Sequence, residues 1–149
     1  MTFEINSTMK NILLLFLVSQ INTFVNAQPI SGKTEKYDVV VSFGSICCGT
    51  VSDDFLVDFI KQVNCKNKVT IQAWQLGGCG REGEFKILFL LNKLNPSAKK
   101  KLITGLKKLV PEQNNKNKKA KASSGPINLD FDFPAKQLEN CSGQLTKWN

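Results

Sequence analysis

The chain has 149 residues and a formal net charge of +8 at pH 7, with five Cys and no His. The lack of His excludes Ser–His and Cys–His catalytic relays. A positive charge of this size attracts polyanions or anionic membranes in general, but the Lys residues gather on one amphipathic segment and in a polar segment at 112–126. We therefore expect a solvated lysine face and no nucleic-acid partner.

The first 27 residues are predicted to be a cleaved signal peptide. A Lys at position 10 precedes an apolar stretch, Ile12–Val18, and the segment ends in Val25-Asn26-Ala27, which favours cleavage before Gln28. The apolar stretch is far shorter than the roughly 20 residues that cross a bilayer. We expect export to the periplasm or the extracellular medium, and no transmembrane segment in the mature chain.

Residues 28–36 are polar, with Pro and Gly, and are expected to be a flexible leader. The next ten residues, "YDVVVSFGSI", are typical of a central strand, because apolar residues occupy both faces. The predicted helix-facing set is Tyr37, Val39, Val41 and Phe43. Apolar residues then recur at helical spacing after Ser52, which suits the position before a helix.

The segments "KVTIQAW" (68–74) and "FKILFLLNKL" (85–94) are predicted to be two strands of a hairpin, joined by the Gly-rich residues 77–84. Asn95-Pro96 opens a second helix, which Pro111 is expected to help end. Residues 112–126 are predicted to be a mobile loop. "INLDFDF" (127–133) alternates as a last strand, and residues 135–149 form a tail with Cys141 and Trp148.

The order strand, helix, strand, strand, helix, strand resembles the ferredoxin-like fold over residues 37–134. This resemblance implies an α+β domain with a four-stranded antiparallel sheet and two helices on one face. The other face would carry Val40, Trp74, Leu88 and Leu90. An apolar patch of this kind needs a cover, which we expect to be either a homodimer partner or the tail with Trp148.

This topology sorts the five Cys residues into two groups. Cys47, Cys48 and Cys79 are expected at one end of the sheet, and Cys65 and Cys141 at the other. In an oxidising compartment we expect a Cys65–Cys141 disulfide, with Cys79 paired to Cys48 or Cys47. A strained disulfide between the neighbours Cys47 and Cys48 is the alternative.

The end with three thiols is the candidate site, and several chemistries compete for it. A soft metal such as Cu(I) or Zn(II) suits the three thiols, and the placement of the first two is similar to heavy-metal-associated domains, which however use Cys-x-x-Cys. Thiol–disulfide exchange is a further possibility. Arg81, Ser45 and Thr50 are candidates for holding an anionic ligand, and Glu82 and Glu84 for an acid/base pair.

Acylphosphatases and RNA-binding domains share the topology, but the Arg-bearing loop of the former is not matched here, and Asp130 and Asp132 do not suit base stacking. The leading hypothesis is a small exported, disulfide-stabilised binding or interaction protein for an unknown protein or small ligand, with no catalysis and no cofactor. The alternative is an extracytoplasmic thiol site that binds a soft metal or exchanges disulfides.

Overall fold

The structure is a computed structural model that describes residues 34–120 and 124–148. It is an α+β fold with two α-helices and one antiparallel sheet of five strands, where four were predicted. In chain order the elements are β1 (Lys36–Ser45), α2 (Asp54–Asn67), β2 (Gln72–Leu76), β3 (Phe85–Leu90), α3 (Pro96–Lys119), β4 (Ser124–Pro134), the 3-10 helix η1 (Ala135–Leu138) and β5 (Leu145–Lys147). Within these described residues, no helix is long and apolar enough to cross a membrane.

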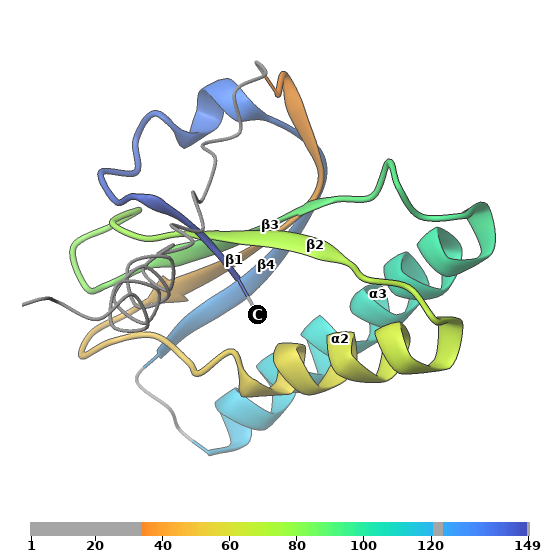
Figure 1. Cartoon of the computed structure of the whole chain (residues 1–149). Coiled ribbons are helices and arrows are strands. Elements are labelled where there is room, and N and C mark those ends of the chain that lie inside the picture. The colour runs from red at the N-terminus through yellow and green to blue at the C-terminus, as the bar shows by residue number, and fades with distance from the viewer. Residues whose placement is uncertain (1–33, 121–123, 149) are drawn as a thin grey trace, which may run out of the picture. The chain divides into compact units, whose positions relative to one another are not determined.

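The strands are arranged in the order β4-β1-β3-β2-β5, and every neighbouring pair is antiparallel. Both α-helices pack on the same face of the sheet (Figure 1), where the main core lies. This core combines inward residues of β1 and β3, such as Val41 and Phe89, with Leu56 of α2 and Leu106 of α3, and all four are buried. The periodic apolar residues of the sequence thus identify most of the core, but Tyr37 and Phe133 belong to the apolar cluster on the opposite face.

The start of β1 departs from the predicted alternation. Val39 faces the helices as expected, but Tyr37 belongs to the apolar cluster on the opposite face. Between them, Asp38 accepts hydrogen bonds from the N–H of Leu91 (2.7 Å) and the ammonium of Lys99 on α3 (2.7 Å). Tyr37 and Val39, although two residues apart, therefore lie on opposite faces, and the regular alternation of β1 is interrupted at Asp38.

The environment of Asp38 lowers its pKa. Burial alone raises the pKa of this carboxyl, but the hydrogen bonds from Lys99 and Leu91, with the charges of Lys99 and Lys36, outweigh it and favour the ionised form. The ionised carboxylate therefore holds the start of β1 against the loop after β3 and the first turn of α3.

α3 is longer than predicted. Asn95 caps it as expected, by accepting a hydrogen bond from the N–H of Ala98 (2.8 Å), but the helix continues through Pro111 to Lys119. Its extension is held by Asn114, whose side-chain amide accepts from the N–H of Ile127 (2.9 Å) and donates to the carbonyl of Ile127 (2.8 Å) on β4. The prediction of a mobile loop over residues 112–126 is therefore wrong at 112–119, which are helical, and at 124–126, which begin β4, while residues 121–123 lie outside the described residues.

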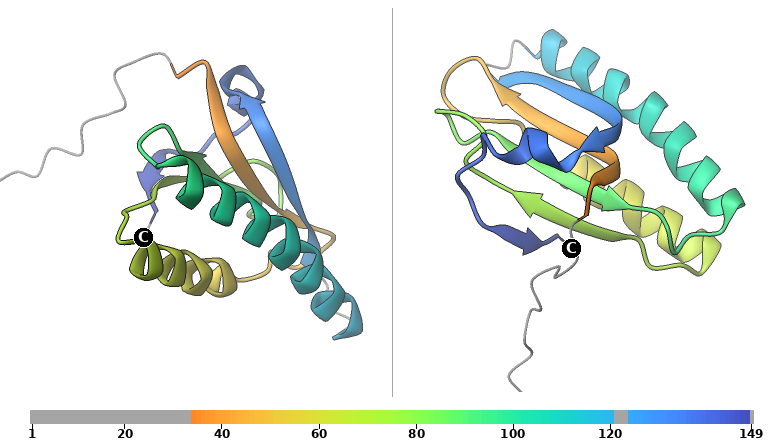
Figure 2. Two further views of the ribbon diagram at one scale, coloured as in Figure 1. Left: turned by 90° about the vertical axis from the view of Figure 1, so that its right-hand side faces the viewer. Right: turned by 90° about the horizontal axis from the view of Figure 1, so that it is seen from above.

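The tail turns back across the face of the sheet that the helices leave open (Figure 2). Ala135 and Leu138 of η1 pack over Val40 and Leu88, which are fully buried. The tail therefore supplies the cover that this face needs. The predicted homodimer surface included Val40 and Leu88. Both are buried under the tail and are not accessible to a partner.

The tail ends on the other side of the sheet. β5 pairs with β2, and Trp148, only 4% exposed, enters the helix-side core with its ring edge against Phe89 (centroids 5.8 Å apart). The indole N–H donates to the carboxylate of Asp53 at the start of α2 (2.6 Å). Trp148 was expected to cover the open face, and this placement corrects that expectation.

Candidate functional site

Two loops meet at one end of the sheet, and we call residues 44–50 and 77–84 together the loop pole. Phe43, near the end of β1, pairs directly with Phe85, at the start of β3, and their rings stack 4.4 Å apart. The first loop follows Phe43 and the second precedes Phe85, so this pair anchors both. Because Phe43 and Phe85 are paired, the two loops begin at the same end of the sheet.

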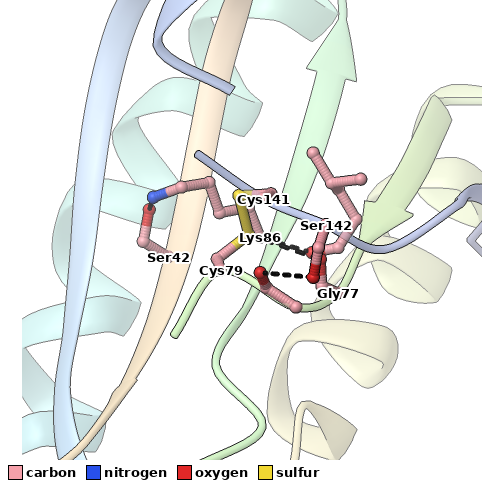
Figure 3. Close-up of a disulfide and its surroundings, with 8 residues drawn as sticks. Ser42, Gly77, Cys79, Lys86, Cys141 and Ser142 are labelled. Atoms are coloured by element: carbon pink, nitrogen blue, oxygen red, sulfur yellow. Dashed lines mark hydrogen bonds between the residues drawn. A yellow bond between two sulfur atoms is a disulfide. The ribbon is translucent and has the colours of Figure 1, made fainter. Parts of the chain in front are cut away.

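The disulfide of the structure joins Cys79 of the loop pole to Cys141 of the tail (Figure 3). Beside it, the N–H groups of Ser142 and Gly143 donate to the carbonyls of Gly78 (3.0 Å) and Gly77 (3.1 Å). A Cβ at position 143 would lie only 2.4 Å from the carbonyl oxygen of Gly77. A glycine at 143 thus lets the tail approach the hairpin turn this closely.

This pairing corrects the expected disulfides Cys65–Cys141 and Cys48–Cys79. The prediction left Cys141 where β4 ends, near the end of α2 that carries Cys65. Instead, η1 and the residues after it carry Cys141 back along the sheet to the loop pole. The sulfur of Cys79 is consequently in a disulfide and is not a third thiol beside Cys47 and Cys48. Across residues 34–120 and 124–148, no group of three or more His, Cys, Asp or Glu side chains is placed to hold a metal ion.

Cys47 and Cys48 are both exposed and carry free thiols, and a hydrogen bond joins their two sulfur atoms at 3.1 Å. This side-chain hydrogen bond raises the pKa of the Cys47 thiol, and desolvation and the charge of Glu82 raise it further. Cys65 is also a free, exposed thiol, but it lies near the far end of α2. The structure thus keeps together two of the three thiols expected at this pole.

The polar candidates of the loop pole do not form one constellation. Arg81 and Glu82 are exposed, and among the described residues no hydrogen bond or ion pair joins Arg81 to Ser45 or Thr50. Thr50 is half-buried, and the hydroxyl of Ser45 is buried with no partner in the described part of the chain. These positions therefore give the predicted anion site no direct support.

Glu84 has a structural part in the hairpin turn. Its carboxylate accepts a hydrogen bond from the N–H of Glu82 (2.8 Å), and its backbone carbonyl accepts from the N–H of Cys79 (3.0 Å). Because the carboxylate of Glu84 folds into its own turn while Glu82 points to solvent, the arrangement does not favour an acid/base pair.

Sequence reasoning missed Ile46 as a site residue. Its side chain is 74% exposed at the tip of the first loop, compared with 39% for Leu145 and 37% for Phe131, the other exposed large apolar residues of the described chain. The sequence alone carries no signal for this exposure, because its pattern makes Ile46 the last residue of the predicted strand "YDVVVSFGSI".

Comparison with known proteins adds no relative from which a role could be transferred: no protein-family model, curated protein or solved structure matches the chain. The loop pole itself is therefore the source of the functional proposal.

Proposed function

We propose that the chain is a small exported, disulfide-stabilised binding protein that contacts a partner protein through the loop pole. The observation that carries this proposal is the exposure of Ile46. Burying a side chain of this size in a partner's apolar pocket contributes about 1.5–3 kcal/mol to binding. The contact needs no catalytic group and no cofactor.

The local conformation supports a role in recognition. Next to Ile46, Cys48 has φ 68° and Gly49 has φ 107°, so the loop has a defined left-handed turn. Conformations of this kind cost free energy at a residue other than glycine and are concentrated at functional sites.

The proposal includes the fold and the compartment. We assign β1–β4 with α2 and α3 to a ferredoxin-like unit to which β5 is added, an assignment that the order β4-β1-β3-β2 and the shared helix face support. Export is supported by the predicted signal peptide, which lies outside the described residues, and by the Cys79–Cys141 disulfide, since such bonds persist in oxidising compartments. Intact mass of the purified protein should show a chain that begins at Gln28.

The binding test uses the mature chain, made in an oxidising compartment and immobilised, with the periplasmic or extracellular fraction of its source applied to it. We expect the same proteins to be retained by wild type and by Leu145→Ser, and to be lost with Ile46→Ser. Both variants replace an exposed apolar residue, so equal melting temperatures exclude a general loss of structure. Retention of the same proteins by Ile46→Ser would contradict the proposal.

A further inference from the structure

Cys47 and Cys48 lie in an unusual arrangement for neighbouring residues. In an extended chain, successive side chains point in opposite directions. Here Cys48 has a left-handed φ of 68°, and the two sulfur atoms lie 3.1 Å apart while both side chains remain exposed. A left-handed conformation at a residue other than glycine costs free energy. The loop pole therefore holds these two thiols together against a conformational cost.

No other Cys residue interferes with this pair. Cys79 and Cys141 are bonded to each other, with both side chains partly buried against the cluster under the tail. Cys65 is near the C-terminal end of α2, which runs from the loop pole to the opposite end of the sheet. Cys47 and Cys48 are accordingly the two free thiols of the loop pole.

We propose that Cys47 and Cys48 are a redox pair that exchanges electrons with disulfides of other molecules. One thiol loses its proton and attacks a sulfur of the external disulfide, which forms a mixed disulfide and releases one thiolate. The neighbouring thiol loses its proton and attacks the protein sulfur of the mixed disulfide, which closes the Cys47–Cys48 bond and releases the second thiolate. The two protons end on the two released sulfurs, so the pair is oxidised by two electrons and the external disulfide becomes two thiols.

The reverse reaction is favoured by covalent geometry. Consecutive Cα atoms are about 3.8 Å apart across a peptide bond, whereas the two Cα atoms of a disulfide are usually about 4.4–6.8 Å apart. A Cys47–Cys48 disulfide is therefore strained, and strained, exposed disulfides are the readily reduced ones. Cys79–Cys141 is partly buried against the cluster under the tail, whereas Cys47 and Cys48 are exposed, so a mild reductant should reach and open the Cys47–Cys48 bond first.

The raised pKa of Cys47 slows the thiol–disulfide exchange near neutral pH. The pKa of Cys47 is raised, chiefly by its hydrogen bond with Cys48, so this thiol is largely protonated near neutral pH, and only the thiolate attacks. Ile46 stands beside the pair and is exposed to solvent. An apolar contact there would favour the disulfide of a protein or peptide over a small polar one such as oxidised glutathione.

The test uses the full mature chain with Cys65→Ser, so that the pair carries the only free thiols. The protein is equilibrated in buffers with increasing ratios of oxidised to reduced glutathione, quenched in acid, alkylated and weighed intact. We expect one two-electron transition in which the mass falls by two hydrogens and alkylation is lost at both Cys47 and Cys48. We expect Cys47→Ser and Cys48→Ser to stop instead at the mixed disulfide, each with one bound glutathionyl group.

Three results would overturn the proposal: two glutathionyl groups on the wild-type pair, one glutathionyl group that is never released, or two thiols that still alkylate in the most oxidising buffer. Because this measurement needs no protein partner, its outcome is independent of whether Ile46 binds one. A second arm with a disulfide-closed apolar peptide identifies the source of the disulfide. If Ile46→Ser exchanges more slowly than wild type with the peptide but not with glutathione, the pair acts on protein disulfides. If the variant and wild type exchange at equal rates with both reagents, the pair acts on small-molecule disulfides.

Discussion

Removing the Cys79–Cys141 disulfide should destabilise the fold strongly. The bond spans 62 residues, and in the chain-entropy model closing a loop of that length removes about 14 cal/mol/K from the unfolded chain, or about 4 kcal/mol at 25 °C. For a domain of this size that corresponds to a fall in melting temperature of roughly 15 °C. We expect this fall in the double variant Cys79→Ser/Cys141→Ser, which leaves no new thiol to form a wrong pair.

The assay is thermal and urea unfolding, followed by circular dichroism, with Cys65→Ser as the matched control. Cys65 is an exposed free thiol, and surface substitutions of this kind usually change stability by no more than about 0.5 kcal/mol. A non-reducing peptide map should contain the Cys79–Cys141 peptide pair. A map with Cys65 linked to Cys141, or a Cys65→Ser variant that loses as much stability as the double variant, would refute the path of the tail described above.

Three further substitutions test other contacts. Trp148→Phe keeps an aromatic ring but removes the N–H that Asp53 accepts, and we expect a loss of about 1.5–3 kcal/mol in urea unfolding. Asn114→Ala removes both hydrogen bonds to Ile127, which should cost about 1–2 kcal/mol and speed hydrogen exchange at the Ile127 amide; unchanged protection there would contradict the account of α3. Asp38→Asn should destabilise the fold at neutral pH and not in strong acid. The folded state lowers the pKa of Asp38, so the ionised carboxylate stabilises the fold above the unfolded pKa of about 3.9. This stabilisation is lost as the pH falls through the folded pKa. Urea unfolding of both proteins across this range gives the comparison, and a difference independent of pH would contradict the assignment.

The order and type of the main elements could be predicted because each has a periodic apolar pattern. Val39, Val41 and Phe43 alternate, and the buried residues Leu102 and Leu106 recur at helical spacing. The length of α3 could not be predicted in this way. Residues beyond Pro111 carry no apolar stripe, and the extension depends on a side-chain contact between Asn114 and a strand that comes later in the chain.

The location of the candidate site could be predicted from the sequence, but its disulfide pairing could not. The topology brings residues 44–50 and 77–84 to one end of the sheet, as expected, and Cys47 and Cys48 lie there. The disulfide partner of Cys79 could not be predicted, because residues 135–149 have neither helical nor strand periodicity to indicate their path. That path is set by a few contacts, such as Leu138 over Val40 and Leu88, which a local pattern does not reveal.

The position of the disulfide has a topological consequence for β1. Cys79–Cys141 closes a covalent ring that contains β3, α3, β4 and η1 but excludes β1. β1 nevertheless lies between β3 and β4, with α3 packed against one face of it and η1 against the other (Figure 2). The ring therefore encircles β1, and the strand is threaded through it.

A threaded strand sets the order of folding events. If β1 docks between β3 and β4 while the thiols are reduced, the ring then closes around it without any chain passing through. If the disulfide forms first, all the residues before β1 must pass through a closed loop before the central strand can reach its place. Oxidised, unfolded protein should therefore regain its structure more slowly than reduced protein, and once the native disulfide has formed, β1 can leave the sheet only by being drawn out along its own length.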